Sequence, residues 1–116
     1  MTEQSIIKGQ KFSFTDAVNY STDGIVSKKI IQKPSGSVSL FAFDEGQELS
    51  EHSAPFDALL QVLEGQAEVI IAGQPFHLKS GESIILPCNI PHAVKATTPF
   101  KMLLTMIKEI VVNLGK

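Results

Sequence analysis

Cysteine is nearly missing from this chain, since Cys88 is the single one among 116 residues. One thiol cannot form an internal disulfide framework, so stabilisation by cross-links is excluded. A chain without disulfides is expected in a reducing compartment, and we therefore expect a cytoplasmic location.

Long apolar runs and strong charge are missing too. No apolar stretch approaches the roughly 20 residues of a membrane span. The N-terminus, Met1 to Ser5, has no basic residue and no long apolar stretch follows it, so we expect no export signal. The net charge is −2 and the pI about 5.9, which gives no electrostatic reason to bind nucleic acid or an anionic membrane.

Familiar catalytic signatures are also missing: there is no CxxC pair, no glycine-rich phosphate loop and no Ser/His/Asp order. With 43% hydrophobic and 19% charged residues, the composition is that of an ordinary globular protein. A length of 116 residues predicts one domain, residues 1–116.

Short strand-like segments dominate what is present. They are rich in β-branched or alternating apolar residues and end at turn clusters; they cover residues 25–32, 37–43, 58–63, 67–71, 75–78, 82–86, 92–96 and 100–106. Ala72-Gly73-Gln74 reads as a tight hairpin turn. Eight or more such strands predict an all-β sandwich or barrel. Residues 1–10 read as a loose end or edge strand, Thr15 or Asp16 could cap a brief helical turn, and residues 109–116 read as either strand or helix.

Two histidines lie in frames spaced by glycines. The first frame runs from Gly46 through His52 to Gly65, and the second contains Gly81, Pro87 and His92. These spacings resemble the two motifs of the cupin superfamily. The resemblance implies a small single-domain β-barrel or jelly roll, the cupin-like double-stranded β-helix, with a barrel core at about residues 25–107.

The sequence departs from the cupin motifs where a metal would be held. Ala54 stands in place of the second His, Ala58 of the Glu, Asn89 of a Gly and Ala96 of an Asn. Only His52 and His92 carry over as metal ligands from the resemblance. A zinc or iron site needs three or more protein ligands, so we expect at most a weakly held divalent ion: Zn, Fe, Mn, Ni or Cu.

Three other polar side chains are candidates for a chemical role. Asp57 could supply a third metal ligand if a bulge at Pro55 re-aimed it, but we favour a structural role, accepting backbone N–H groups in a turn. Cys88 is expected at a cavity rim as inert packing. His77 is expected to point outward, to solvent or a subunit interface.

The expected ligand pocket is apolar with two polar groups. Leu60 and Val62 share a strand face with Ala58, and Phe100, Met102, Leu104 and Met106 share one face of another strand. We expect His52 and His92 to face each other across the barrel interior. The predicted pocket residues are His52, His92, Leu60, Val62, Met102 and Leu104.

Three functions fit this pattern. The first is a module, expected to be a homodimer, that binds a small apolar or weakly acidic molecule beside the two histidines. The second is a metal-dependent dioxygenase or isomerase of the cupin kind with a reduced ligand set, in which His52 would act as a general base if no metal were bound. The third is a structural barrel filled by its own side chains. No catalytic residue is assigned.

Overall fold

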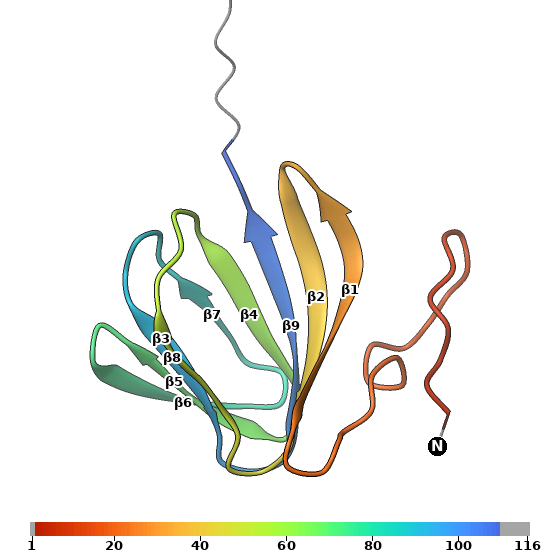
Figure 1. The fold of residues 1–116 in the computed structure, drawn as a ribbon, viewed down its shortest axis with the longest axis horizontal. Helices are drawn as coiled ribbons and strands as arrows, with labels where there is room; N and C mark the ends of the chain where they lie inside the picture. The colour runs from red at the N-terminus through yellow and green to blue at the C-terminus, as the bar shows by residue number, and fades with distance from the viewer. Residues whose placement is uncertain (1, 110–116) are drawn as a thin grey trace, which may run out of the picture.

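Nine strands form two antiparallel sheets in the computed structural model, which describes residues 2–109 (Figure 1). The five-stranded sheet has the order β1 (Ile25–Lys33), β2 (Gly36–Phe43), β9 (Phe100–Ile107), β4 (Ala58–Glu64) and β7 (Ser83–Leu86). The four-stranded sheet has the order β3 (Glu48–His52), β8 (His92–Ala96), β5 (Gln66–Ile71) and β6 (Gln74–Lys79). The predicted all-β barrel is confirmed.

Most strands lie where the sequence pattern predicts them, but the pattern did not predict β3 as a strand. Ala72 and Gly73 connect β5 to β6 with φ of 51° and 81°. Two left-handed residues in a two-residue loop are the type I′ turn that suits a twisted hairpin. The predicted hairpin is therefore confirmed.

The main core lies between the two sheets. Alternate residues of each strand point inward, so β4 contributes Leu60 and Val62 and β9 contributes Phe100 and Met102. The Phe43 and Phe100 rings stack with their centroids 4.5 Å apart. Leu104 and Met106 pack partly buried against the same cluster, so the predicted apolar stripe of β9 does face inward.

A second cluster lies on the outside of the five-stranded sheet. Residues 2–24 run along this face beside β1 (Figure 1), and Ala17 and Val18 are fully buried there against Leu40, Ala42 and Leu103. The alternation of β9 explains this packing, because the residues between the inward ones point to the outer face. Residues 2–10, which were expected as a loose end or an edge strand, form no strand, and Glu3 and Ile6 contact the sheet through Lys28 and the second cluster.

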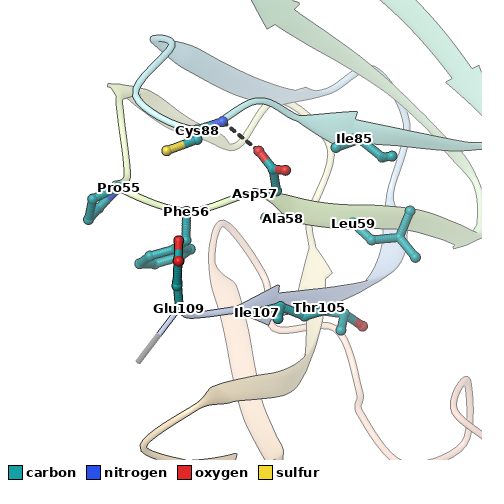
Figure 2. Close-up of a pocket in the computed structure, with 10 residues that line it drawn as sticks. All are labelled: Pro55, Phe56, Asp57, Ala58, Leu59, Ile85, Cys88, Thr105, Ile107 and Glu109. Carbon is teal, nitrogen blue, oxygen red and sulfur yellow. Dashed lines mark hydrogen bonds between the residues drawn. The ribbon is translucent and has the colours of Figure 1, made fainter. Parts of the chain in front are cut away.

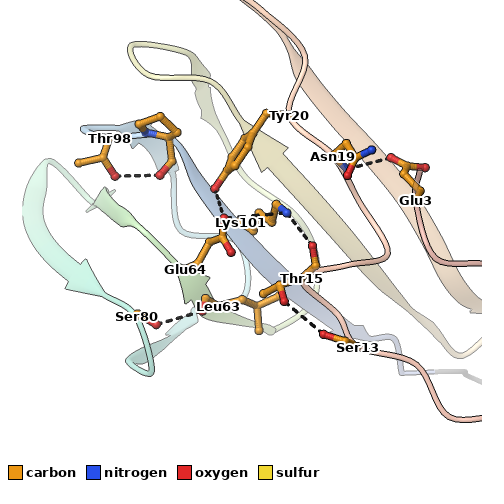
Figure 3. A network of polar contacts seen from close by, with 11 residues as sticks. Glu3, Ser13, Thr15, Asn19, Tyr20, Leu63, Glu64, Ser80, Thr98 and Lys101 are labelled. Carbon is orange, nitrogen blue, oxygen red and sulfur yellow. Dashed lines mark hydrogen bonds and ion pairs between the residues drawn. The ribbon is translucent and has the colours of Figure 1, made fainter. Parts of the chain in front are cut away.

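Polar contacts fix the N-terminal segment to the sheet (Figure 3). The Lys101 Nζ is buried and donates to the Thr15 carbonyl oxygen at 2.6 Å, and it lies 4.9 Å from the centre of the Tyr20 ring. The Tyr20 hydroxyl donates to the Glu64 carboxylate at 2.6 Å. Burial and this hydrogen bond raise the pKa of Tyr20 above its usual range, so the hydroxyl keeps its proton.

Residues 14–16 form turns, where a brief helical turn was expected. Asp16 and Ala17 donate their N–H groups to the carbonyls of Ser13 and Phe14, three residues back in each case. The described part of the chain has no helix with the length and hydropathy to cross a bilayer. Glu109 has no regular structure, and the expectation for residues 110–116 lies outside the described residues.

Candidate functional site

His52 and His92 are neighbours on adjacent strands of one sheet. His52 ends β3, His92 begins β8, and the two residues are directly opposite in the antiparallel register. Their ring centroids are 4.5 Å apart and the ring planes meet at 66°. The expectation that they face each other across the barrel interior is therefore wrong, because β3–β8 pairing makes them a cross-strand pair.

Backbone carbonyls fix the orientation of both rings. The Nδ1 atom of His52 lies 2.9 Å from the Ser50 carbonyl oxygen, and that of His92 lies 3.2 Å from the Ile90 carbonyl oxygen. A carbonyl only accepts, so each Nδ1 carries the proton and each Nε2 of the neutral ring presents a lone pair. Neither Nε2 is hydrogen-bonded to another described residue. Sequence reasoning missed these two carbonyls, since backbone atoms leave no signal in side-chain identity.

The two imidazoles differ in exposure. His92 is 6% exposed and shares the inner side of β8 with Val94 and Ala96, whereas His52 is open to solvent. Burial lowers the pKa of His92, the neighbouring His52 lowers it further, and the bond to Ile90 opposes both effects. His92 is therefore a neutral acceptor at neutral pH.

Stability should depend on this buried imidazole. An unfolded histidine protonates below about pH 6.5, whereas folded His92 does so only at lower pH. Between those pH values the unfolded chain binds one more proton than the folded chain, so the free energy of unfolding should fall as the pH drops from about 6.5. Above about pH 6.5, His92 is neutral in both the folded and the unfolded chain, so it adds no further pH dependence to the free energy of unfolding. Urea unfolding of the parent and of His92→Gln over this range measures the effect.

The matched control for that experiment is His77→Gln, at an exposed residue of β6 that bonds to Gln66 Oε1 at 3.0 Å. We expect the free energy of unfolding to depend less on pH in His92→Gln than in the parent. In His77→Gln it should depend on pH as strongly as in the parent. An unchanged slope in His92→Gln would show that His92 is not kept neutral by the fold.

The other predicted pocket residues lie in the core between the sheets. Leu60, Val62 and Met102 are at most 2% exposed, and Leu104 is partly buried against them. They share the inner side of the barrel with His92. Two open depressions of the surface are found elsewhere, on the outside of the five-stranded sheet, and neither histidine lines them. The pocket beside the histidines stays a prediction.

The donors do not fit a complete metal site. Within residues 2–109, no three His, Cys, Asp or Glu side chains are grouped so that they could hold a metal ion. Ala58 lies in the main core, where its methyl group cannot coordinate. Two imidazoles fall short of the three or more protein ligands of zinc and iron sites.

The loop after β3 differs from the expected strand geometry. Because β3 ends at His52, strand alternation does not extend to Ala54. In this loop the Asp57 carboxylate accepts the Cys88 N–H at 2.8 Å, as Figure 2 shows. Asp57 thus has the structural role that we favoured. Cys88 is exposed and lines the larger surface depression.

Asn89 stands where the second motif has a glycine, and its backbone has a conformation that glycine favours. Its φ is +62°, in the left-handed region that Gly favours and that Asn tolerates best among other residues. The Asn89 N–H donates to the Ala54 carbonyl at 2.7 Å, which joins the loop after β3 to the loop before β8. The same turn places the Ile90 carbonyl oxygen 3.2 Å from the His92 Nδ1 atom.

Solved structures share this fold. The conserved SPY1581 protein of unknown function from Streptococcus pyogenes is 31% identical with a TM-score of 0.86, over 96% of this chain and 98% of that one. A cupin 2 conserved barrel domain protein from Leptotrichia buccalis is 44% identical with a TM-score of 0.81, over 84% of this chain and 47% of that one.

A curated relative matches in part. A probable gamma-glutamyl phosphate reductase of Schizosaccharomyces pombe is 30% identical over 83 residues, or 71% of this chain. The match spans only 18% of that protein's length.

The family comparison covers most of the barrel. The model of the cupin domain matches residues 39–107, which hold both histidine frames and all strands from the middle of β2 to the end of β9. The protein therefore belongs to the cupin family.

Proposed function

We propose that this cupin binds a small apolar molecule that carries a weakly acidic hydroxyl group. The observation that supports the proposal most is the pair of Nε2 lone pairs on rings 4.5 Å apart, each ring held by a carbonyl at its Nδ1. Two neutral acceptors side by side suit a ligand that offers hydrogen-bond donors. Both acceptors are lost when the rings are protonated.

The surroundings suit an apolar ligand body. In the four-stranded sheet, His92 lies directly between His52 and Ile71, and Ile71 packs partly buried against the main core. His52 is open to solvent and His92 is buried, so a ligand could enter past His52 and reach His92. Binding sites of this kind combine apolar walls with a few polar groups that fix orientation.

Metal-dependent catalysis fits the site less well, because the donor set is incomplete among the described residues. No reaction is assigned to the site. The cytoplasmic location rests on the sequence alone and stays a prediction.

Binding of phenol tests the proposal, with toluene as the matched probe that lacks a hydroxyl group. We expect phenol to bind the parent more tightly than toluene does, because only phenol can donate to Nε2. His52→Ala and His92→Ala should each weaken phenol binding, and the variant that lacks both rings should weaken it by about fivefold, the effect of the one neutral hydrogen bond that the phenol hydroxyl donates. Isothermal titration calorimetry gives the dissociation constants of phenol and toluene for each protein.

Two results would reject the proposal. One is equal binding of phenol and toluene, or none of either, with both variants as stable as the parent; the barrel would then be structural. The other is near-stoichiometric metal in protein purified without chelator that disappears in both histidine variants, as measured by elemental analysis. The enzyme alternative would then take its place.

A further inference from the structure

The hydroxyl group of Ser37 is buried on the inner side of the barrel without a hydrogen-bond partner. Ser37 is 7% exposed, and its Oγ atom makes no hydrogen bond with any part of the chain that the structure describes. Along β2, Val38 packs in the outer cluster, whereas Phe41 and Phe43 pack in or against the main core. Alternation therefore directs Ser37 inward. Because nearly all buried polar side-chain atoms have a partner, this exception needs a physical reason.

The strand registers place Ser37 in a layer that runs across the five-stranded sheet. Ser37 lies opposite Met106, which in turn lies opposite Ala58. Ala58 lies opposite Leu86 on β7. The last three residues all belong to the main core or pack against it, so the layer faces the inside of the barrel. Ser37 is the polar member of this layer.

The layer lies at the same end of the barrel as the two histidines. Residues 53–57 join β3 to β4, and residues 87–91 join β7 to β8. Each of these short loops links one histidine of the four-stranded sheet to one member of the layer. Figure 1 shows these strand ends together at the upper end of the barrel, where the two sheets spread apart. Ser37 and His92 thus lie on the inner sides of opposite sheets at one end of the barrel.

Apolar side chains at this end are less buried than those deeper in the barrel. Met102 is 1% exposed, whereas Leu104 and Met106, farther along β9, are only partly buried. Ile71, which lies opposite His92, is partly buried as well. Methionine is unbranched and adapts its shape to what packs against it, so Met106 can move beside a ligand. The serine and the histidines therefore lie where solvent reaches the apolar core.

We infer that the ligand of this cupin carries a second polar group, a hydroxyl or a carbonyl, that hydrogen-bonds to Ser37 Oγ while its acidic hydroxyl donates to a histidine Nε2. This second contact rests on the proposed function, to which it adds the chemistry at the far end of the ligand. A serine hydroxyl both donates and accepts, so it suits either group. The apolar body of the ligand lies between the sheets, against Leu104 and Met106. Such a ligand gives Ser37 the partner that the fold does not supply.

Matched phenols test the second polar group by isothermal titration calorimetry. In 3- and 4-hydroxybenzyl alcohol, a hydroxyl takes the place of the terminal methyl group of 3- and 4-ethylphenol. For at least one of these pairs, the ratio of alcohol affinity to ethylphenol affinity should be about fivefold higher in the parent than in Ser37→Ala, the effect of one neutral hydrogen bond. His92→Ala should weaken the binding of alcohol and ethylphenol equally, because both carry the phenolic hydroxyl.

The matched control is Ser83→Ala, which removes a hydroxyl from an exposed residue of β7 in the same sheet. It should keep the affinity ratio of the parent. Urea unfolding gives a readout that needs no ligand. Because Ser37→Ala removes a buried hydroxyl without a partner, its unfolding midpoint should be equal to or higher than that of the parent.

The outcomes separate this inference from the proposed function. Tighter binding of phenol than of toluene, with the same affinity ratio in the parent and in Ser37→Ala, would reject the second contact and leave the proposed function standing. A lower unfolding midpoint in Ser37→Ala would also reject it, because the hydroxyl would then have a structural partner. If Ser37→Ala weakened binding but the histidine variants did not, the ligand would lie in the smaller surface depression, which Ser37 also lines, and the inference would be wrong.

Discussion

Gly65→Ala is expected to lower the free energy of unfolding by about 3 kcal/mol or more. Gly65 joins β4 to β5 with φ of +76°, a left-handed conformation that costs alanine energy. The added Cβ would also overlap the Pro99 carbonyl oxygen and lie 2.8 Å from the Cα of Phe100. These are backbone atoms, so the overlap could be relieved only by moving β9 away from the turn.

Gly73→Ala is the matched control for the steric part of this effect. Gly73 has φ of +81°, but a Cβ there meets no atom within 4 Å. Gly73→Ala should lower the free energy of unfolding only by the cost of the left-handed conformation, about 1 kcal/mol. Urea unfolding of the three proteins gives both values. If the two variants lost equal stability, the close approach of Pro99 to Gly65 would be refuted.

Lys101→Met is the second substitution with a large expected effect, about 2 kcal/mol of destabilisation. Methionine keeps the apolar stem of the side chain but removes the charged donor to the Thr15 carbonyl oxygen. It also removes the cation that lies over the Tyr20 ring and 3.9 Å from the Glu64 carboxylate. The N-terminal segment should therefore open more often, and trypsin should cleave faster after Lys8 and Lys11.

Lys95→Met is the control, because Lys95 is an exposed residue of β8 whose loss should change stability little. Faster cleavage in Lys101→Met but not in Lys95→Met would support the attachment of the N-terminal segment through Lys101. Equal cleavage rates in the parent and in Lys101→Met would contradict it.

The strands could be predicted from the sequence because alternation and turn residues are local signals. The inward stripe from Phe100 to Met106 and the Ala72–Gly73 hairpin are examples. The N-terminal segment could not be placed in this way. Its burial depends on Ala17 and Val18 packing against β2 and β9, which are far away in the sequence.

The candidate site could be predicted in its residues but not in its geometry. The glycine spacing identified His52 and His92, yet their adjacency depends on the pairing of β3 with β8, which no local pattern encodes. The β3–β8 register also shifts between Leu49 and His52, so alternation alone cannot orient the ring of His52.

The protonation state of the two rings tests the account most directly, because the proposed hydrogen bond needs an Nε2 lone pair on a neutral ring. Long-range ¹H–¹⁵N NMR spectra of the parent distinguish the two neutral forms of each imidazole. Both His52 and His92 should carry their proton on Nδ1 above neutral pH, and phenol should shift the Nε2 resonances of both. Protons on Nε2, or Nε2 resonances that phenol leaves unmoved, would contradict the account.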